Sequence, residues 1–185
     1  MPLPDKSEWV RAFMEQAELD LDFATGLSGL IDAGERCEWL RRRPELYCPT
    51  VYAYCQQAIE KALKAWLWHK NNSIPRRHNP MAAVLKHVEA MGPKHPEHLD
   101  IVDAHRDMLD QVLNMAPGAA CQGATMEILL RQPNTEYPFA VSSTRVKLPR
   151  EEISELDVAS ALKIASPLVV SIKKYLAAQG LYYST

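Results

Sequence analysis

Apolar residues recur every three or four positions through several stretches of the chain, and this spacing is typical of amphipathic helices. The first stretch extends from Ser7 to Asp32, with Ser7 as the expected N-cap. Its apolar positions are Trp9, Val10, Phe13, Ala17, Leu21, Ala24, Leu27 and Ile31. Acidic residues occupy many of the positions between them. The pattern predicts a first helix that buries one face.

A second helix is predicted after Thr50, its expected N-cap, and before Asn72, with residues 35–49 as a connection. Its apolar stripe consists of Val51, Cys55, Ala58, Ile59, Ala62 and Trp66. The opposite side carries Gln57, Glu60, Lys61, Lys64 and Trp68. Glu60 and Lys64, one turn apart, have the spacing of an ordinary surface charge pair. A large aromatic side chain among polar groups is costly to leave in water, so we expect a partner surface to cover Trp68.

Three more helices are predicted downstream. A short one opens at Asn79-Pro80 and closes before Gly92-Pro93, and another spans about 97–115. The last begins near Ser154 or Asp157 and ends at Gly180. Residues 119–150 lose the periodicity and predict an irregular connection before the last helix. The fold class expected is therefore all-α, a single domain over residues 1–185 built as an antiparallel bundle of about five helices.

Composition narrows the function classes. The chain has 21 Lys and Arg against 23 Asp and Glu, a net charge of -2. This charge excludes a protein that binds nucleic acid phosphates over its whole surface. No apolar run approaches the roughly eighteen residues of a membrane span, and the first residues lack the pattern of a secretory signal. The four cysteines are irregularly spaced, as reduced thiols are. We expect a cytoplasmic protein with no membrane contact.

Several segments, taken in their order along the chain, carry a family resemblance. They are Ala17–Ala24 (AELDLDFA), Gln57–Ala65 (QAIEKALKA), Pro75 and His78 before a helix, and the late pair Tyr137-Pro138. In this order they resemble the HEPN domain, over about residues 7–179. The resemblance implies an all-α bundle that typically dimerises. Family members include RNases, nucleotide-binding modules and helical partners of minimal nucleotidyltransferases, often in toxin–antitoxin or defence systems.

Two departures from the family pattern argue against catalysis. The catalytic branch carries an Arg followed by His after four to six intervening residues, a pair suited to acid–base chemistry and phosphate stabilisation. None of the arginines of this chain has a histidine at that spacing. Glu136 precedes Tyr137-Pro138 where the family commonly has Arg, so a carboxylate replaces a phosphate-binding cation. No catalytic residues and no cofactor are therefore expected.

His78 matches the histidine of the family pattern and stands beside Arg76 and Arg77. One interpretation makes His78 a cap in its turn. The other is an anion or nucleotide site at the end of the second helix, where free backbone N–H groups of the next helix add to the charge. Its expected residues are Lys61, Lys64, Arg76, Arg77, His78 and Tyr137. The remaining histidines lack the spacing of a metal site, so none is expected.

The sequence thus favours a non-catalytic HEPN-like binding module. We expect a homodimer or a complex with a nucleotidyltransferase-type partner, with Gln57 and Trp68 in the interface and nucleotide or RNA as the other possible ligand. One alternative is a metal-independent RNase of toxin or defence type that combines His78 with Arg76 or Arg106. The second alternative is a purely structural interaction protein.

Overall fold

The computed structural model describes residues 5–32, 42–71, 78–91, 100–115, 139–142 and 145–182. These residues form the helices α1 (Lys6–Asp32), α3 (Pro44–Asn71), α4 (Met81–Met91), α5 (Asp100–Ala104), α6 (Arg106–Asn114) and α8 (Glu155–Ala178). Two short strands, β1 (Phe139–Ser142) and β2 (Arg145–Lys147), and a 3-10 turn, η4 (Pro149–Glu151), precede α8. The all-α class is therefore confirmed. None of the described helices is long and apolar enough to cross a bilayer.

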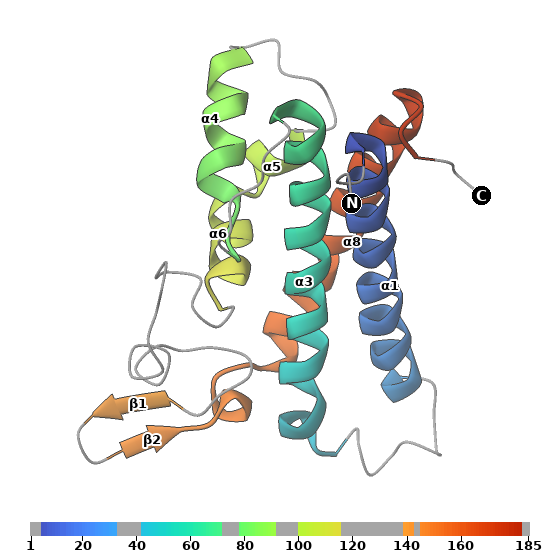
Figure 1. The fold of residues 1–185 in the computed structure, drawn as a ribbon. Helices are drawn as coiled ribbons and strands as arrows, with labels where there is room; N and C mark the ends of the chain where they lie inside the picture. Colours follow the sequence, from blue (N-terminus) through green and yellow to red (C-terminus); the bar gives the residue numbers. More distant parts are fainter. Residues whose placement is uncertain are drawn as a thin grey trace.

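Three long helices, α1, α3 and α8, form the centre of the bundle (Figure 1). The ring of Trp9 packs against Trp68, and Phe23, at the other end of α1, packs against Tyr54, so α1 and α3 run antiparallel. In contrast, α8 runs in the same direction as α3. The Tyr47 hydroxyl, near the start of α3, donates to Glu155 at 3.0 Å in the first turn of α8. The intervening chain therefore returns to the end of the bundle where α3 begins.

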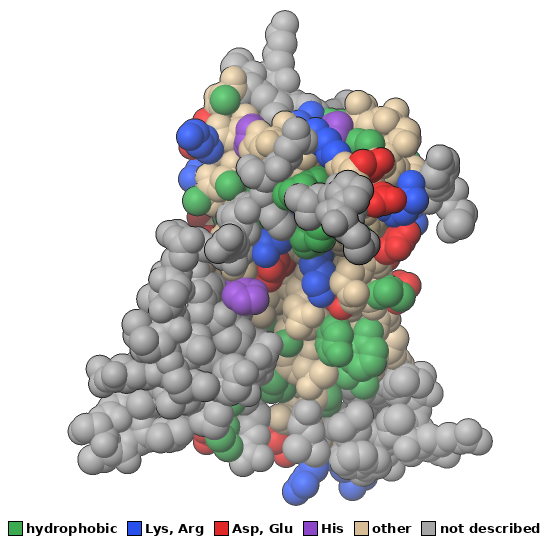
Figure 2. All heavy atoms as spheres, viewed as in Figure 1, with side chains coloured by type: hydrophobic (Ala, Val, Ile, Leu, Met, Phe, Trp, Pro, Cys, Tyr) green, Lys and Arg blue, Asp and Glu red, His purple; other side chains and the backbone are tan. Residues whose placement is uncertain are grey.

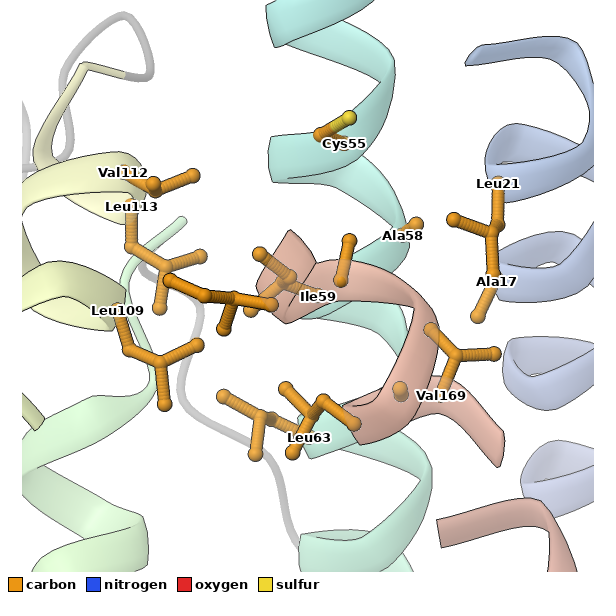
Figure 3. Close-up of a cluster of buried hydrophobic side chains, with 14 of the residues drawn as sticks. Ala17, Leu21, Cys55, Ala58, Ile59, Leu63, Leu109, Val112, Leu113 and Val169 are labelled. Atoms are coloured by element: carbon orange, nitrogen blue, oxygen red, sulfur yellow. The ribbon is translucent and has the colours of Figure 1, made fainter. Parts of the chain in front are cut away.

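Helix α3 is central because it has neighbours on several sides. Figure 3 shows its side chains between those of α1 on one side and those of α6 on the other, with turns of α8 crossing in front of α3. The buried contacts come from Ala17 and Leu21 of α1, Cys55, Ala58, Ile59 and Leu63 of α3, Leu109, Val112 and Leu113 of α6, and Val169 of α8. The buried Gln56 side chain donates to the carbonyl of Val112 at 2.6 Å, at the end of α6, so this buried amide is paired across two helices.

The helix boundaries match the local capping signals except at three places. Ser7 is not the N-cap of α1, because the helix begins at Lys6 and Asp5 accepts from the backbone N–H of Glu8 at 2.9 Å. Asn79 accepts a hydrogen bond from the backbone N–H of Met81 at 2.9 Å, and Ser154 forms a capping box at the start of α8. The predicted start of the second helix at Thr50 is wrong, because α3 begins at Pro44, where a proline loses no helical hydrogen bond. The predicted helix over about 97–115 is interrupted at residue 105 and gives α5 and α6.

The irregular connection predicted over residues 119–150 is only partly within the described residues. Its described end is an antiparallel pair of strands, with residue 139 opposite 147 and 140 opposite 146, followed by η4. The sequence prediction missed this hairpin. Strands of four and three residues are too short to leave a recognisable alternation of apolar and polar positions.

Candidate functional site

The polar residues of segment Gln57–Ala65 lie in the middle of α3 and point toward two different neighbours. Figure 2 shows basic, acidic and histidine side chains gathered over this part of α3. Lys61 is directed toward α1, whereas Glu60 and Lys64 lie next to His78, just before α4. The site is therefore two adjoining clusters, each built around one carboxylate.

The first cluster joins α3 to α1 through Asp20. The ammonium group of Lys61 donates to Asp20 Oδ2, and it also donates to Gln57 Oε1 at 3.1 Å. The other carboxylate oxygen of Asp20 accepts from the Gln16 amide at 3.0 Å. The side chain of Asp20 is 4% exposed and that of Lys61 is 23% exposed. The charge of Lys61 is thus balanced by a buried carboxylate of its own chain.

The second cluster is built around Glu60. Lys64 Nζ donates to Glu60 Oε1 at 2.6 Å, and His78 Nδ1 lies 3.2 Å from Glu60 Oε2. The side chains of Glu60 and Lys64 are only 10% and 11% exposed. The interpretation of these two residues as an ordinary surface pair is therefore wrong. Because α3 has neighbours on several sides, even the side opposite its main apolar stripe is largely covered.

His78 is the most exposed member of this second cluster, with 55% of its side chain exposed. Asn79 caps α4 by accepting from the backbone N–H of Met81, and residues 72–77, which precede His78, lie outside the described residues. With Glu60 as acceptor, the matching form of the imidazole carries a proton on Nδ1. This contact fixes the orientation of the ring, which is the arrangement that a histidine needs for acid–base chemistry.

Trp68 and Gln57, the expected interface residues, are both half-buried within the chain. Trp9 packs against Trp68 with ring centroids 5.8 Å apart, so α1 itself covers part of this indole. The indole N–H of Trp68 is buried and makes no hydrogen bond within the described ranges. Gln57 accepts from Lys61. Their place in an interface between proteins stays a prediction.

The structure brings Lys61, Lys64 and His78 into one region of the surface of α3. Arg76, Arg77 and Tyr137, the other residues of the expected anion site, lie outside the described residues. No group of three or more His, Cys, Asp or Glu side chains that could hold a metal ion occurs in the part of the chain that the structure describes.

Asp20 and Gln16 are the cluster members whose roles the sequence analysis did not find. Asp20 lies three positions after Ala17 and four before Ala24, both fully buried, so it follows the spacing of the apolar face of α1. A carboxylate on a buried face must have a partner. This spacing was the available signal for Asp20, whereas Gln16 stands outside the apolar stripe and gave none.

The comparisons with known proteins gave one match, to a family model. No curated protein and no solved structure has a significant match to the chain. The family model of the HEPN domain matches residues 45–113, which contain the Glu60, Lys64 and His78 cluster and the helices α4, α5 and α6. The resemblance found in the sequence is thereby confirmed for this segment, since residues 45–113 match the HEPN domain model.

Proposed function

We propose that the protein is a non-catalytic HEPN-type binding module whose ligand is another protein. One observation carries this proposal: both lysines of the QAIEKALKA segment are paired with carboxylates of the same chain. A phosphate could take Lys61 from Asp20, or Lys64 from Glu60, only by leaving a nearly buried carboxylate without its partner. Such an exchange costs several kcal/mol. A protein partner does not require it.

A nucleotidyltransferase-type partner and a homodimer, both typical of the family, belong to this proposal, and nucleotide or RNA is the less favoured ligand. Titration of the protein with ATP and with a mixed RNA pool separates the ligand classes. We expect no saturable binding to either. Saturable binding that disappears in the Arg76→Ala/Arg77→Ala double variant would contradict the proposal and establish the anion site instead.

The oligomeric state is measured by sedimentation at increasing protein concentration. We expect a species larger than the 20.9 kDa monomer, because HEPN domains often dimerise. A 20.9 kDa species that persists at all concentrations would remove the homodimer from the proposal.

The contact between Glu60 and His78 favours a second candidate, a metal-independent RNase. A histidine held by a carboxylate can take the proton from the 2′-hydroxyl of RNA while that oxygen attacks the adjacent phosphorus. The products are a 2′,3′-cyclic phosphate and a 5′-hydroxyl that receives a proton. A cation must stabilise the charge on the phosphate oxygens, and Lys64, the cation bonded to Glu60, is only 11% exposed.

The RNA pool incubated with stoichiometric protein in metal-free buffer tests this candidate, with His78→Ala as the variant and His105→Ala as the control. His105 is an exposed histidine at the junction of α5 and α6. Under the proposed function no cleavage occurs with any of the three proteins. Cleavage that is lost in His78→Ala and kept in His105→Ala would replace the proposed function by the RNase.

A further inference from the structure

Helix α1 has a second apolar stripe in addition to the face that it buries. The buried face consists of Val10, Met14, Ala17, Leu21 and Ala24. The second stripe consists of Trp9, Ala12, Gln16, Leu19, Phe23 and Gly26, all of which are exposed; Gln16, which donates to Asp20, is its one polar member. Its members are three or four residues apart in strict alternation, which is the a/d spacing of a coiled-coil seam. We call these six residues the outer stripe.

The outer stripe exposes large apolar side chains on a helix that is already packed on its other side. The exposed fractions are 38% for Trp9, 62% for Leu19 and 48% for Phe23. At Gly26 an added Cβ atom would meet nothing within 4 Å, so this end of the stripe faces open space. Apolar surface of this extent is typical of a site of association.

The two aromatic ends of the outer stripe are held in place by other rings of the chain. Trp9 packs against Phe13 at 6.3 Å and against Trp68 at 5.8 Å between ring centroids. Phe23 packs against Tyr54 at 4.3 Å. Anchors that are already fixed lose little conformational entropy on binding, which is why rigid aromatic side chains dominate the energetics of interfaces.

The charges beside the outer stripe determine which partner fits. Glu8, Glu15 and Asp22 are exposed, are seven residues apart and follow one edge of the stripe; within the described ranges none of them forms an ion pair. On the other edge Lys61 is neutralised by Asp20. The rim of the stripe therefore carries a net negative charge.

A second copy of α1 does not complement this rim. In an antiparallel pairing about Gln16, Glu8 of one copy would face Asp22 of the other, and the two Glu15 side chains would face each other. In a parallel pairing Glu15 would lie beside the neutral Lys61–Asp20 pair of the other copy, whose carboxylate is 4% exposed. The antiparallel arrangement brings like charges together, and the parallel one brings no opposite net charge to the acidic edge, so neither favours association.

We propose that the outer stripe of α1 binds an amphipathic helix of a different protein, with leucine-like residues at a/d spacing and Lys or Arg along the facing edge. This mode of recognition places the apolar face of one helix against an apolar face of the other, while the charges beside the seam select the partner. The inference rests on the proposed function as a protein-binding module and names the surface and the chemistry of its partner.

Two synthetic helical peptides with identical leucine positions test the proposal, one with lysines beside the leucines and one with glutamates. We expect saturable binding of the lysine peptide to the full-length protein by fluorescence anisotropy, weakened by added salt, and no saturable binding of the glutamate peptide. Leu19→Asp and Glu15→Lys/Asp22→Lys should each weaken binding at least tenfold. The matched controls are Leu156→Asp, at a leucine of α8 that is 80% exposed, and Glu89→Lys, on the exposed side of α4. Neither control should change the affinity.

Three results would overturn the proposal: no binding of the lysine peptide, equal binding of both peptides, or an affinity that Leu19→Asp leaves unchanged. Sedimentation supplies a fourth, since a dimer that Leu19→Asp converts to a monomer would identify a second copy as the occupant. Circular dichroism of each variant confirms that it is folded. A failure of the proposed function can be told apart from a failure of this inference. It would be seen as His78-dependent cleavage of RNA, which the peptide measurement does not involve.

Discussion

Removal of the positive charge of Lys61 should destabilise the protein through Asp20, its partner on α1. Lys61→Met keeps a side chain of similar length and removes the ammonium group. The Asp20 carboxylate, 4% exposed, then retains only the hydrogen bond from Gln16. Breaking a fully buried ion pair costs about 3–5 kcal/mol. Because Lys61 is 23% exposed, water can reach the vacated position, and we expect a loss of about 2–3 kcal/mol.

Removal of the negative charge of Asp20 should lower the free energy of unfolding less than removal of the positive charge of Lys61. In Asp20→Asn the lysine keeps its contact with Gln57 and its partial exposure to water, so we expect a loss of about 1–2 kcal/mol. The double variant carries neither charge, and its loss should be smaller than the sum of the two single losses by about 1 kcal/mol or more. A loss in the double variant that is smaller than the sum of the single losses shows that the two side chains interact directly.

Urea denaturation followed by far-ultraviolet circular dichroism measures the free energy of unfolding of the four proteins. Lys163→Met is the matched control, since Lys163 is an exposed lysine of α8 and its loss should change stability by no more than about 0.5 kcal/mol. The reasoning is refuted if Lys61→Met costs no more than Lys163→Met, or if the two single losses add without coupling.

Three other predictions concern single residues. Burial raises the pKa of Cys48 to about 11 and that of Cys55 to about 12, so alkylation of both thiols near neutral pH should be much slower in the native protein than in urea, as peptide mass mapping would show. Burial, and after it the charge of Lys70, lowers the pKa of His69 below 6.5. The unfolded chain therefore takes up the proton first as the pH falls, so the melting temperature should fall as the pH drops through 6.5. This fall should be smaller in His69→Gln. Ser154→Ala should cost about 1 kcal/mol in urea denaturation, because it removes the capping box of α8, whereas Ser154→Asp should retain most of the stability.

Most of the helices could be predicted because their signals are local. The cap at Asn79, the start of α8 near Ser154, and the apolar spacing of α1 and α8 depend only on residues within a few turns of each other. The start of α3 could not be placed, because Pro44 and Pro49 resemble helix breakers in isolation. In the structure α3 continues through Pro49, and its following turns bury Val51 and Tyr52 against the core.

The candidate site was less predictable, because its contacts join separate elements. Lys61 and Asp20 are 41 residues apart and Glu60 and His78 are 18 apart. The sequence placed these side chains on helices, but which faces meet is decided by how the helices pack. The burial of Glu60 and Lys64 follows from the central position of α3, and helical periodicity alone does not reveal how many neighbours a helix has.

The direction of α8 has a consequence for how the chain folds. Its contacts with the first two long helices join residues far apart in sequence: Tyr47 with Glu155 are 108 residues apart, and Glu18 with Lys173 are 155 apart. Closing loops of that length costs conformational entropy before the contacts form and stabilise the chain. Proteins rich in such distant contacts therefore fold more slowly. During synthesis α1 and α3 leave the ribosome long before α8, and the apolar surface of α3 that packs against α8 stays open until then. Nascent chains of this protein should therefore depend on chaperones more than an up-and-down bundle of the same length would.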